Sequence, residues 1–215
     1  MIATATSAPT DTANVFADPR IPQALRRSLT LMDITEPTPI QAQTISALLD
    51  GNDLIGQART GSGKTLAFGL PLVLKCDPTV RSVQALVLAP TRELANQVGD
   101  VIDRLAATRG LKLTVLYGGH SLFGERKALI AGPQIVVGTP GRTLDHLRQG
   151  NLILSGLRLF VLDEADQMLD RGFAPDVERI LAFTPSKRQT VLFSATIPGW
   201  VASTAARHLH KPVTV

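Results

Sequence analysis

The stretch Ala58-Arg59-Thr60-Gly61-Ser62-Gly63-Lys64-Thr65 stands between a short apolar run and a helical pattern. A glycine-rich loop in this position lets backbone N–H groups face phosphate oxygens, and the N-terminus of the following helix adds partial positive charge. We expect Lys64 to reach the β- and γ-phosphates of a nucleotide and the Thr65 hydroxyl to hold Mg²⁺. Loops of this kind usually have glycine where this chain has Ala58. The stretch predicts a phosphate-binding loop; a glycine-rich turn that only caps a helix is the alternative.

The rest of the chain repeats this alternation of a short apolar run with a helical pattern. Each run is rich in Val, Leu or Ile, as is typical of strands buried on both faces of a sheet. The runs cover residues 53–56, 85–88, 113–117, 135–137, 159–162 and 190–193. Amphipathic stretches such as Thr91 to Arg109 lie between them. The alternation predicts an α/β fold with a mostly parallel, twisted sheet and helices on both faces.

An acidic pair, Asp163-Glu164, follows the apolar run 159–162. We expect Asp163 to hold Mg²⁺ directly or through water, and Glu164 to orient or deprotonate an attacking water. Acidic residues are also favourable in the first turn of a helix, where they meet the helix dipole, and this is the alternative explanation. The phosphate loop upstream favours the catalytic interpretation.

Polar or glycine-rich segments follow almost every apolar run. They are Gln57–Thr65, Pro90–Leu94, Gly118-Gly119, Thr139–Arg142, Asp163–Asp166 and Ser194–Thr196. In open α/β sheets, ligand sites lie at the carboxyl ends of the strands. We therefore expect these segments to meet at one edge of one sheet.

Two of these segments begin helices. Thr91 and Thr139 each fit an N-cap, and Pro140 suits the first helical position. The free N–H groups of helix N-termini are ready sites for phosphate, and Arg92 and Arg142 add positive charge. The segments predict contacts with a phosphate-bearing ligand, and simple helix capping is the alternative.

The residues Asp163-Glu164-Ala165-Asp166, together with the segments above, resemble the DEAD-box family of RNA helicases in order and in spacing. The resemblance covers about residues 16–215, and it includes a Q motif at Pro37–Gln41 and the family's own version of the phosphate loop, in which Ala58 is expected. It implies a RecA-like P-loop domain that binds ATP and Mg²⁺ and uses Lys64, Asp163 and Glu164 in catalysis. The implied ATP contacts are Phe16, Gln41, Ala58, Arg59, Thr60, Gly61, Ser62, Gly63, Lys64 and Thr65.

The resemblance also implies how adenine is recognised. Gln41 would hydrogen-bond the adenine edge, and Phe16 would stack on or near the ring. The residues Thr38-Pro39-Ile40-Gln41 also form a capping box, which is the alternative explanation for Gln41. Asp33 and Ile34 stand where the family usually has glycine followed by an aromatic residue, a difference that bears on the local turn and not on the adenine contact.

The RNA-binding segments of the family match nine residues of this chain. They are Pro90, Thr91, Arg92, Gly118, Gly119, Thr139, Pro140, Gly141 and Arg142. They would grip the backbone of single-stranded RNA, and backbone contacts carry little sequence information, so we expect binding that depends on salt and not on RNA sequence. The resemblance further implies that the hydroxyls of Ser194 and Thr196 hydrogen-bond Asp166 and couple the nucleotide site to RNA.

A complete enzyme of this family has a second RecA-like domain, which supplies arginine fingers and closes over ATP and RNA. We expect the 215 residues to comprise the first domain only, to bind nucleotide and to hydrolyse it slowly. One alternative is a one-domain nucleotide- and RNA-binding module without turnover. Another is a DNA-directed helicase domain, since the sequence does not measure discrimination by the 2′-hydroxyl.

Composition sets broader limits. A net charge of +4 permits a polyanionic partner without proving one. The single cysteine, Cys76, excludes a disulfide within the chain, and no apolar run approaches the ~20 residues of a membrane span. We therefore expect a cytoplasmic protein without a membrane partner. Residues 1–15 are rich in Ala, Thr, Ser and Pro and predict a flexible tail before the domain at 16–215.

Overall fold

The computed structural model describes residues 14–119 and 121–215 and contains a seven-stranded sheet. The strand order is β3-β4-β2-β5-β6-β1-β7, and every neighbouring pair is parallel. The strands are β1 (Leu54–Gln57), β2 (Ala85–Leu88), β3 (Leu113–Leu116), β4 (Ile135–Gly138), β5 (Leu159–Leu162), β6 (Gln189–Ser194) and β7 (Val213–Thr214). The helices are η1 (Val15–Ala17), α1 (Gln23–Leu31), α2 (Pro39–Leu49), α3 (Lys64–Lys75), α4 (Arg92–Ala107), α5 (Leu122–Ile130), α6 (Pro140–Arg148), α7 (Ala165–Asp170), α8 (Ala174–Ala182) and α9 (Gly199–His208).

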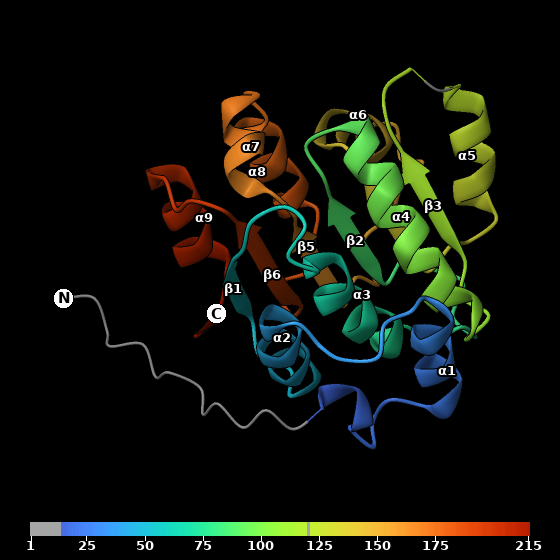
Figure 1. Ribbon diagram of the computed structural model, residues 1–215. Coiled ribbons are helices and arrows are strands. Elements are labelled where there is room, and N and C mark those ends of the chain that lie inside the picture. The colour runs from blue at the N-terminus through green and yellow to red at the C-terminus, as the bar shows by residue number, and fades with distance from the viewer. Residues whose placement is uncertain (1–13, 120) are drawn as a thin grey trace.

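Helices cover both faces of the sheet (Figure 1). Alternate residues of each strand point to opposite faces, so the strands supply two separate apolar clusters. On one face, Val87 and Val161 pack with residues of α1, α2, α3 and α4. On the other face, Leu88 and Leu162 pack with residues of α5, α6, α7, α8 and α9. The predicted α/β class, with a parallel sheet between two helical layers, is confirmed.

All six predicted apolar runs are strands, with ends that differ by at most a residue or two. Strand β7 was not predicted, because it is only two residues long and its residues are half-buried or exposed. It pairs with β1, with Leu54 opposite Val213. Most of the predicted tail, residues 1–13, lies outside the described residues, while Val15 is already buried in η1. Among the residues that the structure describes, no helix is long and apolar enough to cross a membrane.

The turn after α1 keeps a left-handed residue even though the chain lacks the expected glycine. Asp33 has φ 58°, and the Ile34 N–H donates to the Leu29 carbonyl over 2.9 Å. This is the helix ending in which glycine is normally preferred, because a side chain is strained at positive φ. The departure at Asp33 therefore leaves the turn in place and adds local strain.

Replacing Asp33 with glycine is expected to stabilise the fold. Removing a side chain from a left-handed position recovers about 1 kcal/mol, which corresponds to a rise in Tm of about 2–4 °C for a domain of this size. Asp33 is exposed, so the substitution removes no packing. Thermal unfolding followed by circular dichroism checks the result. Asp33→Ala is the control and should give no gain; equal gains for both variants would contradict the explanation.

Candidate functional site

The phosphate loop leaves the carboxyl end of β1 and enters α3 at Lys64. Gly61 has φ 83° and Gly63 has φ 90°, conformations that side chains rarely adopt. A Cβ atom on Gly63 would lie 2.5 Å from the Gln41 Nε2 atom, so a side chain there would displace the Gln41 amide from its present position. The loop is thus shaped around open backbone, as the sequence predicts for a site that faces phosphate.

Lys64 joins this loop to the acidic pair after β5. Its Nζ atom lies 2.8 Å from Glu164 Oε1 and 3.2 Å from Asp163 Oδ1, and all three side chains are buried. Glu164 adopts a left-handed φ of 57°, and this sharp turn between β5 and α7 places both carboxylates at the loop. Residues far apart in the sequence therefore meet here as predicted.

Glu164 is held by three donors. Besides Lys64, the Thr60 hydroxyl donates to Oε1 over 2.7 Å and the Gln167 amide donates to Oε2 over 2.6 Å. Sequence reasoning did not include Gln167, although it lies three residues after Glu164, a spacing that brings side chains together on a helix. The carboxylate is fixed in direction, as a group that orients a water molecule must be.

Asp163 has the chemistry of a metal ligand. Burial raises the pKa of its carboxyl group to about 6, while the nearby Lys64 ammonium opposes the rise. Both carboxylate oxygens are buried, and among the described residues Oδ1 has only the ion pair with Lys64 while Oδ2 has no hydrogen-bond partner. Buried carboxylates normally have such partners. A divalent cation would supply one, and Thr65, at the start of α3, offers a hydroxyl oxygen beside the loop. The residues present fit Mg²⁺.

Gln41 is bound to the phosphate loop. Its Oε1 atom accepts from the Thr38 N–H over 2.9 Å, which is one half of the predicted capping box, and its Nε2 atom donates to the Gly63 carbonyl over 3.1 Å. The Thr38 hydroxyl donates to the Ser62 carbonyl over 3.1 Å. The capping interpretation of Gln41 is thereby confirmed, and the same side chain connects the start of α2 to the loop.

Phe16 packs into the core beside this region. Only 6% of it is exposed, and it belongs to the apolar cluster that includes residues of α1 and α2. It also lines an open pocket of about 270 Å³ together with Ile34, Thr35 and Arg26. Neither Gln41 nor the phosphate loop lines this pocket, and the predicted stacking of Phe16 on an adenine ring stays a prediction.

Asp166 is linked to the segment after β6. Its carboxylate Oδ2 accepts from the Thr196 hydroxyl over 3.0 Å and from the Thr196 N–H over 2.9 Å. Its backbone N–H donates to the Ser194 hydroxyl over 3.1 Å. The pKa of Asp166 is lowered because the hydrogen bonds from Thr196 outweigh the opposing effect of burial, which is the largest single influence. The hydrogen bonds expected between these residues are present.

Three strand-end segments, residues 90–92, 118–119 and 139–142, lie at the same edge of the sheet because the strands before them are parallel. The Thr91 hydroxyl accepts from the Leu94 N–H over 3.1 Å, which confirms it as an N-cap. Thr139 precedes α6 but its side chain makes no capping hydrogen bond. Gly119 has φ 93°, and a Cβ there would lie 3.9 Å from an Arg92 guanidinium nitrogen, so two of the segments approach each other.

The two arginines of these segments differ in their surroundings. The side chain of Arg92 is 58% exposed and pairs only with the exposed Glu93 among the ion pairs of the described residues. The side chain of Arg142 is 12% exposed, and its Nη1 atom lies 2.9 Å from the buried Glu125 Oε2. The positive charge of Arg142 therefore faces a carboxylate that sequence reasoning missed, and the predicted contact of Arg142 with RNA stays a prediction.

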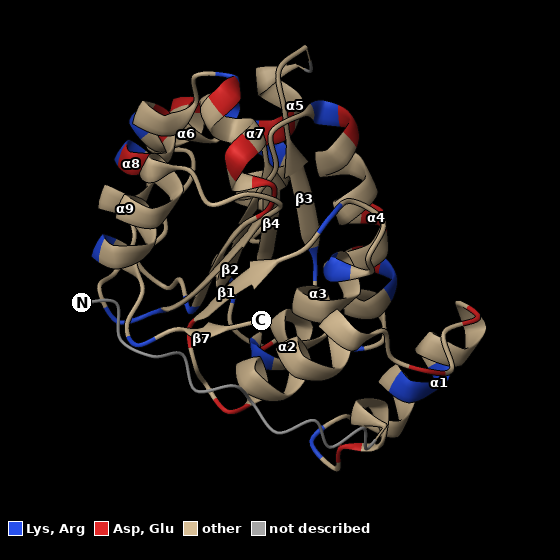
Figure 2. Cartoon of the chain, turned by 60° about the vertical axis from the view of Figure 1, so that its left-hand side comes forward, with Lys and Arg blue, Asp and Glu red and all other residues tan. Residues whose placement is uncertain are grey.

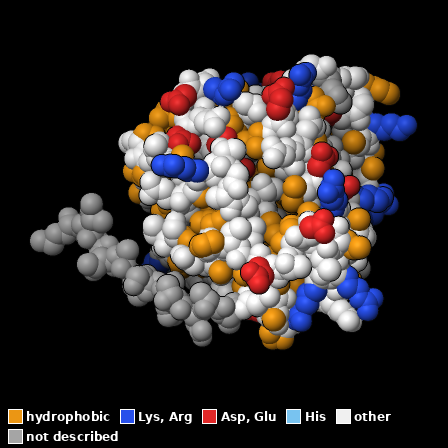
Figure 3. All heavy atoms as spheres, viewed as in Figure 1, with side chains coloured by type: hydrophobic (Ala, Val, Ile, Leu, Met, Phe, Trp, Pro, Cys, Tyr) orange, Lys and Arg blue, Asp and Glu red, His pale blue; other side chains and the backbone are white. Residues whose placement is uncertain are grey.

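Charge alone does not mark this edge of the sheet. Basic and acidic residues both occur on many of the helices (Figure 2), and their side chains are interspersed over the face shown in Figure 3. The distinguishing features are the open backbone of the glycines and the helix N-termini, which bind phosphate through N–H groups.

A glycine-rich loop that joins a parallel strand to a helix, with a buried lysine facing two carboxylates from β5, which is separated from β1 by β6 alone, defines a RecA-like P-loop domain. The sequence matches the DEAD/DEAH box helicase family over residues 38–204, and the chain belongs to this family.

Relatives agree with this assignment. The chain is 50% identical to "ATP-dependent RNA helicase DeaD" of Klebsiella pneumoniae over 201 residues, covering 93% of this chain and 31% of the relative. It is 46% identical to "ATP-dependent RNA helicase CshA" of Listeria monocytogenes, covering 92% of this chain and 38% of the relative. The crystal structure of a DEAD box protein from Methanococcus jannaschii matches with a TM-score of 0.89 and 38% identity, over 93% of this chain and 55% of that one. The chain thus spans about a third of the two helicases and about half of the crystallised protein.

Proposed function

We propose that this chain is the ATP-binding domain of an ATP-dependent RNA helicase. The observation that carries the proposal is the meeting of Lys64 with Asp163 and Glu164 at the carboxyl edge of the sheet, where the buried Asp163 Oδ2 has no hydrogen-bond partner among the described residues. The family assignment and the names of the relatives support ATP as the nucleotide and RNA as the second ligand.

The phosphate loop would bind ATP through its backbone N–H groups and Lys64. Lys64 pairs with both carboxylates, so ATP binding would exchange part of this pairing for the β- and γ-phosphates. Thr65 and Asp163 would hold Mg²⁺, which neutralises developing charge on the phosphates when bound. Glu164, fixed by Thr60 and Gln167, would orient a water molecule for attack and accept its proton.

The three strand-end segments would bind the backbone of single-stranded RNA. Their N–H groups and glycines suit phosphate, and contacts of this kind do not read sequence. Asp166 lies three residues after Asp163, the proposed Mg²⁺ ligand, and its carboxylate accepts two hydrogen bonds from Thr196. These hydrogen bonds connect the nucleotide site to the segment after β6. This connection supports the predicted coupling of ATP and RNA binding.

Efficient turnover and duplex unwinding would require a second RecA-like domain. We expect the protein to act in the cytoplasm. An arginine finger from such a domain is typically worth about 10³–10⁵ in rate. Because Lys64, Asp163 and Glu164 are all present and meet, a binding module without turnover is the weaker alternative.

The test is ATP turnover with and without single-stranded RNA, measured for this chain and for a longer protein that also carries a second RecA-like domain. We expect slow turnover by the chain alone and RNA-stimulated turnover by the longer protein. If neither protein hydrolyses ATP although both bind RNA, the binding-module alternative is correct.

A further inference from the structure

A buried carboxylate, Glu125, lies beneath the strand-end segments and joins two of them. One of its oxygens, Oε1, accepts from the backbone N–H of Tyr117 over 3.1 Å. The other, Oε2, lies 2.9 Å from Arg142 Nη1 and 2.8 Å from His146 Nε2. Glu125 is 5% exposed and His146 is fully buried. Buried carboxylates with several partners of this kind resist rearrangement, because a lost partner leaves a charge unpaired.

The partners of Glu125 come from both sides of the proposed RNA site. Tyr117 directly precedes Gly118-Gly119, so its N–H fixes the point where that turn begins. Arg142 and His146 lie on α6, whose N-terminus follows Thr139. The backbones of these two segments already meet through the pairing of β3 with β4 and through the Thr139 N–H, which donates to the Leu116 carbonyl over 2.9 Å. Glu125 adds a side-chain link between the residue before the glycine turn and the first turns of α6.

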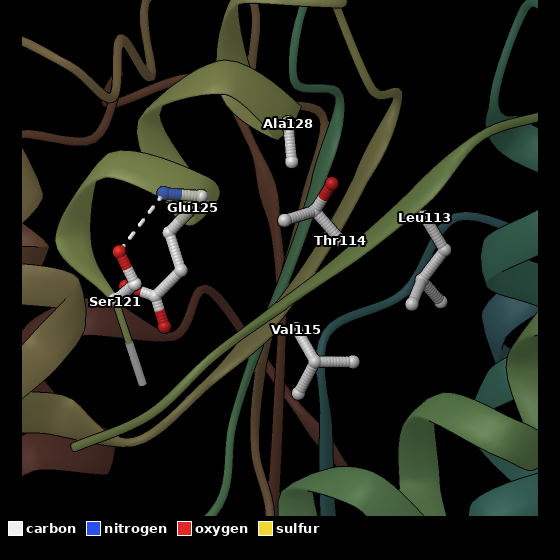
Figure 4. Close-up of a pocket in the computed structure, with 7 residues that line it drawn as sticks. Leu113, Thr114, Val115, Ser121, Glu125 and Ala128 are labelled. Atoms are coloured by element: carbon white, nitrogen blue, oxygen red, sulfur yellow. Dashed lines mark hydrogen bonds between the residues drawn. The ribbon is translucent and has the colours of Figure 1, made fainter. Parts of the chain in front are cut away.

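Helix α5 has few other attachments to the body of the domain. Its buried residues are Glu125 and Leu129, while Phe123 is 78% exposed and Ile130 is 73% exposed. An open pocket of about 310 Å³ separates α5 from the edge strand β3, with Ser121, Glu125 and Ala128 on one side and Leu113, Thr114 and Val115 on the other (Figure 4). The contacts of Glu125 therefore contribute much of what holds α5 and the turn before it against the sheet.

We propose that Glu125, with Arg142 and His146, forms a buried brace that positions the two strand-end segments 118–119 and 139–142 for RNA. Glu125 and Arg142 are positioning residues in this proposal, and the Arg142 charge is used against Glu125 and not against an RNA phosphate. The inference rests on the proposed function, because it assigns these segments to RNA. It also makes a statement about the ligand-free chain that can be tested separately.

Salt dependence distinguishes a brace from a phosphate contact. Each phosphate neutralised by a protein cation contributes about 0.7 to the slope of log affinity against log salt for single strands. We expect Arg142→Gln to weaken the binding of a fluorescein-labelled oligouridine to this chain roughly tenfold while leaving the slope unchanged. Arg92→Gln is the matched control, since Arg92 is exposed at the neighbouring segment, and it should lower the slope by about 0.7.

Glu125→Gln tests the other half of the brace. The amide oxygen can still accept from the Tyr117 N–H, but the charge opposite Arg142 is lost. We expect Glu125→Gln to weaken RNA binding. The effects of Glu125→Gln and Arg142→Gln should not add: the double variant should bind RNA as tightly as the single variant with the lower affinity, because both changes break the same set of contacts. Stronger binding by Glu125→Gln, independent effects in the double variant, or a lowered salt slope in Arg142→Gln would overturn the proposal.

If the wild-type chain does not bind RNA, the proposed RNA-binding role of these segments is wrong. Hydrogen exchange tests the brace independently of RNA binding. We expect Glu125→Ala to accelerate amide exchange at residues 117–119 while exchange in β1 and α3 stays as in the wild type. Unchanged exchange at 117–119 would overturn the brace. General acceleration throughout the sheet would show a merely structural role for Glu125 and would also overturn it.

Discussion

Replacing Lys64 with alanine is expected to lower the affinity for ATP–Mg²⁺ roughly 10- to 100-fold, because hydrogen bonds to charged groups contribute about 1.5–3 kcal/mol each. Turnover should fall further, by about 10²–10³, because the ammonium group also stabilises charge that develops on the transferred phosphoryl group. Lys64 is buried and is the only lysine or arginine that forms an ion pair with Asp163 or Glu164 among the described residues. Calorimetric titration with ATP and a phosphate-release assay measure the two effects.

The variant also changes the ligand-free protein. Two buried carboxylates would lose their shared cation, so we expect the variant to have a lower Tm. The ATP titration and the phosphate-release assay should therefore be run well below the Tm of the variant. Lys75→Ala, at the far end of the same helix, is the control and should leave both affinity and turnover unchanged. Wild-type affinity in Lys64→Ala would mean that nucleotide binds elsewhere.

The second large effect is expected for Glu164→Gln. Loss of a general base typically lowers the rate about 10²–10⁴-fold, whereas the amide keeps the size of the side chain and can still accept from Lys64 and Thr60. ATP affinity should therefore change little, and the loss should appear in kcat and not in KM for ATP. Steady-state turnover of the longer protein in saturating RNA measures both constants.

Asp170→Asn is the matched control for this variant, because Asp170 is an exposed carboxylate at the other end of α7. It should turn over ATP at the wild-type rate. A Glu164→Gln variant with wild-type kcat would remove Glu164 from the chemistry and leave it a structural partner of Lys64, Thr60 and Gln167.

The sheet and the core of the site could be predicted because their signals are local in sequence. The phosphate loop needs glycines and a lysine in one short stretch, and each buried strand is a continuous apolar run. Parallel strands then bring their carboxyl ends together, which is why Lys64 and Glu164 meet although they are far apart in the chain.

The contacts that could not be predicted are those between side chains of different elements with no pattern of their own. In the sequence, Glu125 is one of several charged residues in a short helical pattern, and nothing in that pattern predicts its burial. The fold shows that Glu125 is buried against Arg142 and His146. The hydrogen bond from Gln41 to the Gly63 carbonyl likewise depends on how α2 packs beside the loop. Asp33 shows the opposite case, in which tertiary structure retains a turn that the local sequence disfavours.

A calorimetric titration of the wild-type chain with ATP, in the presence of Mg²⁺ and in the presence of EDTA, tests whether this edge of the sheet is an ATP site. We expect one nucleotide bound per chain, with affinity that falls when Mg²⁺ is removed, because Thr65 and Asp163 would then hold no cation against the phosphates. Absence of ATP binding by a folded chain, or binding that is indifferent to Mg²⁺, would contradict the assignment of this edge of the sheet as an ATP site.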